Sequence, residues 1–233
     1  AHRYSTVYNG GFANHLPMGL IALDGMGASD EALARFAQVN ARKLEPLGAE
    51  ESARVNEFRR RLGEEGLAAV FAAHAPAFAP GIGSAAFHGA IRTAYALESG
   101  SEMEVAHALC YWHSSLHALP AFAMPIGSES PVQILQAISR DPAFAMKRPP
   151  GRSIAARMDH AAREPAFAAY VARLNPADLH VDAFAEALIS AYAATGDFTL
   201  LHGVTGCHAF GNLLGLFPNQ FEATCCLWTA VAA

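Results

Sequence analysis

The sequence predicts an all-α protein, and three observations lead to that expectation. Apolar residues recur every three to four positions, which is helical spacing, over most of the chain. Alanine is abundant, and hydrophobic residues make up 52% of the 233 residues. Strand signals are nearly missing, because the one Asn-Gly pair, in residues 8–11, lacks flanking alternation of β-branched or aromatic residues. We therefore expect one helical domain over residues 1–233.

The apolar-periodic segments mark the expected helices in chain order. They cover residues 31–44, 49–63, 83–100, 104–119, 130–140, 181–196 and 200–214. Ser29 and Ser130 precede two of these segments as N-caps, and Pro131 suits a first helical position. Gly100 and Gly196 stand where C-terminal caps belong. Proline-rich stretches supply the expected connections, at residues 76–83, 120–131 and 141–151.

Charge and hydropathy argue against two classes of partner. The net charge is −5, and the basic run 59–61 is offset by neighbouring glutamates, so we read it as a solvated helix face and expect no nucleic-acid partner. The longest apolar stretch, residues 66–83, is broken by His74, Pro76 and Pro80, so we expect no membrane span.

The four cysteines show no CxxC spacing, which predicts buried, reduced thiols and a cytoplasmic protein. The chain starts at Ala1 without Met and ends in the helix-like "LWTAVAA". We expect both termini to be trimmed.

Two short motifs resemble cofactor-binding motifs but lack the sequence context that those motifs require. "GIGSAA", residues 81–86, imitates a dinucleotide fingerprint but follows a Pro-Ala repeat instead of a strand, so we expect a tight turn at Gly81 and Gly83. We find no Rossmann or flavin signature and expect no tightly bound dinucleotide. Glu104 and His107 have the ExxH spacing of di-iron bundles, but a second ExxH is missing, so we expect a surface pair.

Histidines in apolar segments are the stronger signal. His113 and His117 stand at i and i+4, so on one helix their rings could chelate a metal or could simply occupy a polar face. His202 and His208 are six residues apart, which places their rings about 120° apart and roughly 9 Å apart along a helix. A regular helix therefore cannot bring both to one ion, although the glycines between them permit distortion. His15 also lies in an apolar context.

Three motifs occur in order along the chain: "GGFANHLPMGLIALDGMGAS" (10–29), "FHGAIRTAYALE" (87–98) and "GDFTLLHGVTGCHAF" (196–210). Together they resemble the questin oxidase-like family, from about Tyr8 to about Trp228. The resemblance implies an all-helical oxygenase-like fold and Baeyer-Villiger-type oxygen insertion into anthraquinones, with O2 as oxidant and NADPH as transient reductant. It also implies a non-haem iron centre, which is associated with part of the family.

The resemblance further implies a site. Its recurrent histidines match the expected catalytic residues and metal ligands around a shared central cavity: His15, His88, His202 and His208. His113 and His117 are the second choice for a metal. Aromatic walls would come from Phe12, Phe87, Phe198 and Phe210, and an anionic phenolate would meet Arg92 and Tyr95, which follow His88 on one helix face. Asn14 and Asp197 would orient histidine rings. Met18 and Arg92 stand where fungal members tend to have histidine, which puts a fungal substrate in doubt.

Three functions stay open on the sequence. The first is an oxygen-dependent monooxygenase or oxidase of a polycyclic aromatic or quinone-like small molecule. The alternative is a non-catalytic helical protein that binds a hydrophobic small molecule in a histidine-lined pocket. The third is a zinc hydrolase, which would need a carboxylate base near the metal.

Overall fold

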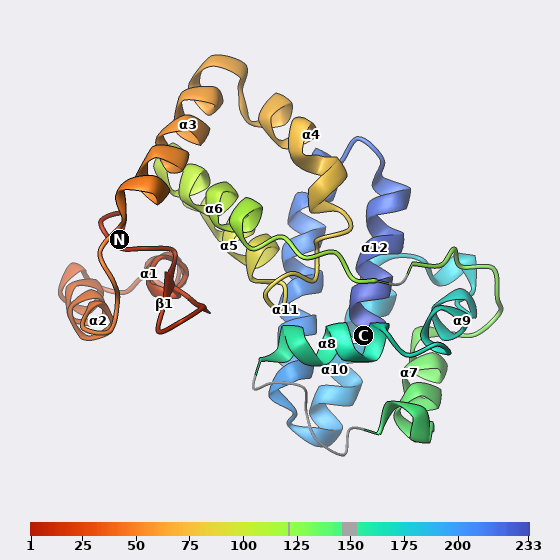
Figure 1. Cartoon of the computed structure of the whole chain (residues 1–233). Coiled ribbons are helices and arrows are strands. Elements are labelled where there is room, and N and C mark those ends of the chain that lie inside the picture. The colour runs from red at the N-terminus through yellow and green to blue at the C-terminus, as the bar shows by residue number, and fades with distance from the viewer. Residues whose placement is uncertain (121, 146–152) are drawn as a thin grey trace.

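The computed structural model describes residues 1–120, 122–145 and 153–233, and it confirms the all-α prediction (Figure 1). The only strands in these ranges are Val7–Tyr8 (β1) and Phe12–Ala13 (β2), an antiparallel pair with Val7 opposite Ala13. No helix in the described ranges is both long and apolar enough to cross a bilayer.

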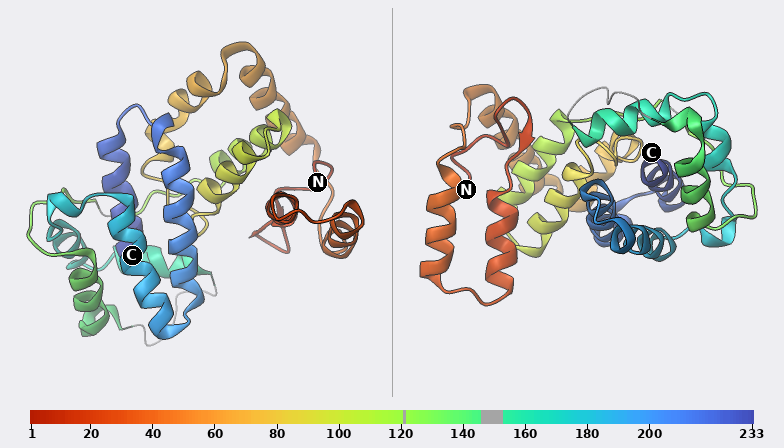
Figure 2. Two further views of the ribbon diagram at one scale, coloured as in Figure 1. Left: turned by 180° about the vertical axis from the view of Figure 1, so that it is seen from behind. Right: turned by 90° about the horizontal axis from the view of Figure 1, so that it is seen from below.

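The N-terminal part consists of two helical hairpins. After the strand pair, helices α1 (Leu16–Gly25) and α2 (Asp30–Ala41) form a hairpin that lies to one side in both views of Figure 2. Ser29 caps α2 by accepting a hydrogen bond from the Ala32 amide, as expected. Helices α3 (Ala49–Glu65) and α4 (Leu67–Phe78) follow, with Arg60 and Arg61 paired to neighbouring glutamates on the exposed face of α3.

The described remainder of the chain is also helical. The elements are α5 (His88–Glu98), α6 (Glu102–Ser114), α7 (Pro131–Arg140), α8 (Ile154–Ala162), α9 (Phe167–Ala172), α10 (Val181–Thr195), α11 (Phe198–Leu213) and α12 (Gln220–Ala232). Short 3-10 turns lie at 142–144, 176–178 and 214–216. Helix α5 packs against both α6 and α11, and α10 packs along α11 (Figure 1).

Large aromatic side chains fill the core between these helices. The fully buried Trp112 stacks on Phe78 with ring centroids 4.3 Å apart and donates its indole N–H to the Gly81 carbonyl. The fully buried Trp228 donates to the Val171 carbonyl at 3.0 Å, so each buried indole keeps a polar partner. The four cysteines are free and buried in this core, as the sequence predicted.

The caps agree with the sequence prediction, whereas several boundaries differ. Gly100 and Gly196 both adopt positive φ after a helix, and Ser130 forms a capping box ahead of α7. Helix α4 runs through Pro76 to Phe78, so the expected connection at 76–83 is shorter than predicted. Of the expected connection 141–151, only residues 141–145 lie within the described ranges.

Two predicted helices are too long. The segment 83–100 becomes helical only at His88, because Ala85, Ala86 and Phe87 adopt left-handed φ values of 49°, 56° and 65°. The segment 104–119 is helical only to Ser114, after which the Ser115 amide bonds back to the Tyr111 and Trp112 carbonyls and ends the helix.

Candidate functional site

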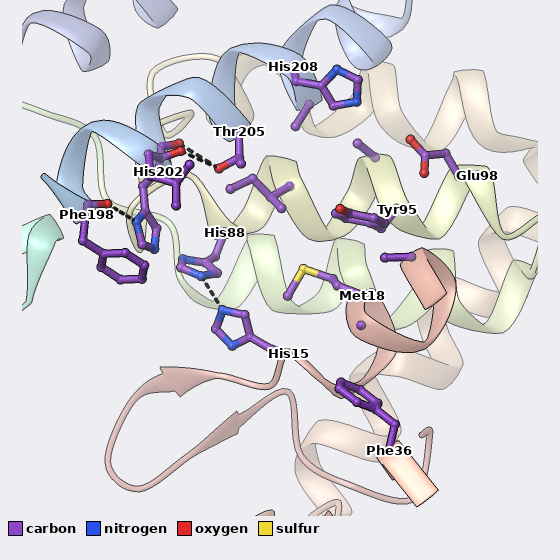
Figure 3. Close-up of a pocket in the computed structure, with 16 residues that line it drawn as sticks. His15, Met18, Phe36, His88, Tyr95, Glu98, Phe198, His202, Thr205 and His208 are labelled. Carbon is purple, nitrogen blue, oxygen red and sulfur yellow. Dashed lines mark hydrogen bonds between the residues drawn. The ribbon is translucent and has the colours of Figure 1, made fainter. Parts of the chain in front are cut away.

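A largely apolar pocket of about 350 Å³ opens between helices α1, α2, α5 and α11 (Figure 3). This volume lies within the range of small-molecule sites, roughly 300–1,000 Å³. Its apolar wall includes Met18, Phe36, Ile91, Ala94, Leu201 and Ala209.

Three histidines from distant parts of the sequence meet at one end of this pocket. His15 immediately precedes α1, His88 is the first residue of α5, and His202 lies in the second turn of α11. The Nε2 atoms of His15 and His88 are 2.9 Å apart. The ring centroids of His88 and His202 are 5.2 Å apart (Figure 3). The fold therefore brings together three of the four expected histidines.

Each of the three rings is held through its Nδ1 atom by a main-chain carbonyl. The acceptors are the carbonyls of Ala13 for His15 at 2.6 Å, Ala85 for His88 at 2.6 Å, and Phe198 for His202 at 2.8 Å. A carbonyl oxygen only accepts hydrogen bonds, so Nδ1 must carry the proton in all three rings. A neutral ring then has an unprotonated Nε2, which is the nitrogen that can serve as base or ligand.

Burial favours the uncharged form of two of these rings, His88 and His15. It lowers the pKa of His88 to about 4, although the hydrogen bond to Ala85 opposes the shift. Burial is also the main cause of the lowered pKa of His15, to which the nearby His202 contributes. Two lone pairs thus face each other across 2.9 Å, an arrangement that favours a hydrogen-bond donor or a cation placed beside them.

The residues do not fit a resident metal ion. Two Nε2 atoms 2.9 Å apart match adjacent ligands of an ion with bonds of about 2.1 Å at right angles. Catalytic metal sites, however, usually have three protein ligands. In the part of the chain that the structure describes, no three His, Cys, Asp or Glu side chains are grouped so that they could hold a metal ion.

The other end of the pocket has a different polar set. His208 lies there with Tyr95 and Glu98, away from the three-histidine cluster in Figure 3. The structure therefore places the fourth expected histidine in the pocket but not with the other three. The regular course of α11 explains this separation, as the spacing of His202 and His208 predicted.

Several expected substrate contacts do not line the pocket. Arg92 is only 2% exposed and pairs with Glu104, its Nη2 donating to Oε1 at 3.1 Å. Phe12 lies exposed on β2, whereas Phe87 and Phe210 are buried in the core. Of the expected aromatic and phenolate contacts, Tyr95 and Phe198 do line the cavity. Arg92 therefore does not line the pocket, because its charge is engaged by Glu104 inside the protein.

The expected orienting residues act instead as local caps. Asn14 accepts from the Leu16 amide at 3.0 Å and donates to the Ser5 carbonyl. Asp197 caps α11 by accepting from the Thr199 amide at 2.7 Å. Main-chain carbonyls orient the histidine rings, and side-chain types in a sequence do not reveal such partners.

The second-choice metal pair is separated by the end of α6. His113 lies with its ring centroid 5.3 Å from that of His74, whereas His117 lies beyond the helix and its Nε2 bonds Asp159 at 2.8 Å. Because the helix ends at Ser114, His113 and His117 are not one turn apart on a common helix face as predicted.

The expected surface pair Glu104 and His107 is also wrong. Both are buried, at 3% and 2% exposure, where Glu104 bonds Arg92 and the His2 ring stacks on His107. An apolar stretch around a charged residue was the sign of burial that the sequence offered.

Two further pocket residues, Phe36 and Glu98, could not be identified from the sequence. Phe36 comes from α2, and Glu98 from the last turn of α5. Phe36 meets α1 where Gly19 leaves room, because a Cβ at position 19 would lie 2.5 Å from the Phe36 ring. Amphipathic periodicity predicts an inner face for these helices but not that this face borders a cavity.

A family model described as Questin oxidase-like matches residues 67–232. The match includes His88, His202 and His208, and it begins after the segment that holds His15. Searches of curated proteins and of solved structures found no match.

Proposed function

Because the chain belongs to the questin oxidase-like family, a membership that indicates an oxidoreductase, we propose that its pocket oxidises a small aromatic molecule with O2. The substrate class is a polycyclic phenol or hydroxyquinone. The observation that carries the proposal is the set of three imidazoles at one end of an apolar cavity, each with its Nδ1 atom held by a main-chain carbonyl.

The pocket walls suit a flat, apolar ring system. Met18, Ile91 and Leu201 offer aliphatic surface, and Phe198 packs edge-on to His202 with ring centroids 4.5 Å apart. Burying aromatic area against such walls contributes about 25 cal/mol per Å². The polar groups at the two ends would then fix the orientation of the ring.

The histidine cluster would bind and deprotonate a phenol. A phenolic O–H directed between the Nε2 atoms of His15 and His88 meets two acceptors 2.9 Å apart. Transfer of that proton to His88 or His15 leaves a phenolate beside an imidazolium, and the attraction between these opposite charges offsets the burial that lowers the pKa of the ring. The phenolate is more electron-rich than the phenol and so more readily oxidised. General-base action of this kind contributes typically 10²–10⁴-fold to a rate.

The oxidation also needs a source of electrons and protons. In a monooxygenation, one atom of O2 enters a ring bond next to a carbonyl and the other leaves as water, which consumes two electrons and two protons. NADPH is the reductant proposed for this step, acting transiently. Iron, if present, would have to draw its ligands from a rearranged pocket.

One titration tests substrate binding and proton transfer together. A dihydroxyanthraquinone changes its visible absorbance when its phenol ionises, so the protein is added at a pH where the free compound is neutral. We expect the bound compound to show the phenolate spectrum, and oxygen uptake to begin when NADPH is added. Bound compound without the phenolate spectrum and without oxygen uptake would overturn the proposal in favour of a binding protein.

Elemental analysis of protein purified without chelators or a nickel column completes the test. We expect substoichiometric metal. Near-stoichiometric iron would overturn a mechanism in which the histidines act as bases without a metal ion. Near-stoichiometric zinc would favour the hydrolytic alternative.

A further inference from the structure

The turn that precedes His88 has an unusual conformation. Ala85, Ala86 and Phe87 adopt left-handed φ values in succession, and none of them is glycine. Left-handed backbone costs about 1–2 kcal/mol per non-glycine residue, so surrounding contacts must hold this turn. The same turn supplies the Ala85 carbonyl that fixes the His88 ring at 2.6 Å.

Both ends of the turn are clamped. At its start, the Ser84 hydroxyl accepts from the His117 amide at 2.8 Å and donates to the His117 carbonyl at 3.1 Å. At its end, the buried Phe87 side chain rests on Gly206 of helix α11. A Cβ at position 206 would lie 2.6 Å from Phe87 Cγ and 2.9 Å from Phe87 Cβ, so only glycine allows this approach.

Gly206 and His202 stand four residues apart, on the same face of α11. One helix face therefore presents His202 to the pocket and seats the residue before His88. The distance between α11 and the start of α5 then sets the spacing of the two imidazoles.

We infer that Gly206 and Phe87 are positioning residues for His88: the packing of Phe87 on Gly206 holds the left-handed turn that aims His88 Nε2 at His15. The inference deepens the proposed function and rests on it for the role of His88 as a base. Neither residue touches the substrate, and both act through the His88 ring.

The experiment compares Gly206→Ala with Gly211→Ala. Both changes add one methyl group to α11, but at position 211 the new Cβ meets only Val181 Cγ1 at 3.9 Å. The first readout is the NMR titration of the His88 imidazole, which needs neither substrate nor turnover. We expect Gly211→Ala to titrate like the unmodified protein, and Gly206→Ala to titrate closer to the ordinary histidine value of about 6.5 as the ring leaves its buried position.

The second readout is oxygen uptake with a dihydroxyanthraquinone and NADPH. A displacement of about 1 Å at a reacting group can cost about 100-fold in rate, and we expect a loss of this order for Gly206→Ala only. Phe87→Leu provides a second variant if Gly206→Ala fails to fold. It keeps an apolar side chain but removes the aromatic ring that packs on Gly206. It should shift the His88 titration in the same direction.

An unchanged His88 titration in folded Gly206→Ala or folded Phe87→Leu would overturn the inference. If the unmodified protein consumes no oxygen while Gly206→Ala shifts the His88 titration, the positioning role stands and the proposed function is defeated. Equal oxygen uptake by Gly206→Ala and Gly211→Ala, with unchanged titration, would defeat the positioning role alone.

Discussion

Two histidine clusters of the molecule share one property and differ in the others. His88 in the pocket and His107 in the interior both have a pKa lowered to about 4, and burial is the main cause in each case. His107 stacks against His2, beside the buried ion pair of Arg92 and Glu104. His88 has no charged partner among the residues that the structure describes, and it borders a cavity.

A lowered pKa alone therefore does not distinguish a site from a structural network. In the interior cluster, which we call the Arg92 network (His2, Arg92, Glu104 and His107), charge is balanced by charge. In the pocket cluster, each Nδ1 is satisfied by the main chain and each Nε2 is left to face the cavity or a neighbouring ring. Open space next to an unprotonated nitrogen is what favours chemistry at the second region.

The largest expected effect separates the two clusters by activity. His88→Ala removes a nitrogen of the proposed base, so oxygen uptake with a dihydroxyanthraquinone should fall about 10²–10⁴-fold. The helical circular dichroism should be unchanged, because the residue lies at a helix end beside a cavity. His107→Gln is the matched control, and its rate should stay within a factor of a few. Equal losses in both variants would erase the distinction.

The next effect separates them by stability. Glu104→Gln leaves the Arg92 guanidinium buried without a counter-charge, and breaking such a pair costs about 3–5 kcal/mol. Urea unfolding should show this loss, while dihydroxyanthraquinone affinity changes little because neither residue lines the pocket.

The exposed Glu64→Gln serves as the control for Glu104→Gln, since its partner Arg60 is solvated and the pair lies on the outer face of α3. A Glu104→Gln protein as stable as the Glu64→Gln protein would mean that the Arg92 network does not support the fold.

These two regions also show how far the sequence could be read. Helical periodicity and caps such as Ser130 and Gly196 act locally, so the fold class and most elements could be predicted. The motif order pointed to the histidines that share the pocket. The direction of Arg92 could not be predicted, because its partner Glu104 lies on another helix and a helix face has several neighbours. The left-handed turn before His88 could not be predicted either, because it packs on Gly206, which lies more than a hundred residues later in the chain.

A smaller effect is expected from pH, and both clusters contribute to it. A histidine with a folded pKa near 4 and an unfolded pKa near 6.5 binds fewer protons when folded throughout that interval. The free energy of unfolding should therefore fall as pH drops from about 6.5 to about 4, by on the order of 1–2 kcal/mol per histidine after solvent screening. Urea unfolding at several pH values measures the slope.

The variants assign that slope to its sources. His107→Gln should reduce the pH dependence of the free energy of unfolding. It should not change the pH at which bound dihydroxyanthraquinone loses its phenolate spectrum. If the slope persists in His107→Gln and also in His88→Ala, the lowered pKa values of these two rings are not its source.

The smallest expected effect concerns the histidines that sequence spacing made attractive. His113 and His117 lie on opposite sides of the end of α6, and His117 pairs with Asp159 at the surface. Because neither lines the three-histidine pocket, the double change His113→Ala/His117→Ala should leave oxygen uptake, metal content and the His88 titration unchanged. The main-chain atoms of His117 that bond Ser84 are kept in the double variant, so the turn before His88 is also retained.

His202→Ala is the opposing variant, and it should weaken binding of the dihydroxyanthraquinone by removing one pocket imidazole. If the double variant loses activity while His202→Ala keeps it, the reacting site lies at the end of α6 and the comparison between the two clusters concerns structure alone.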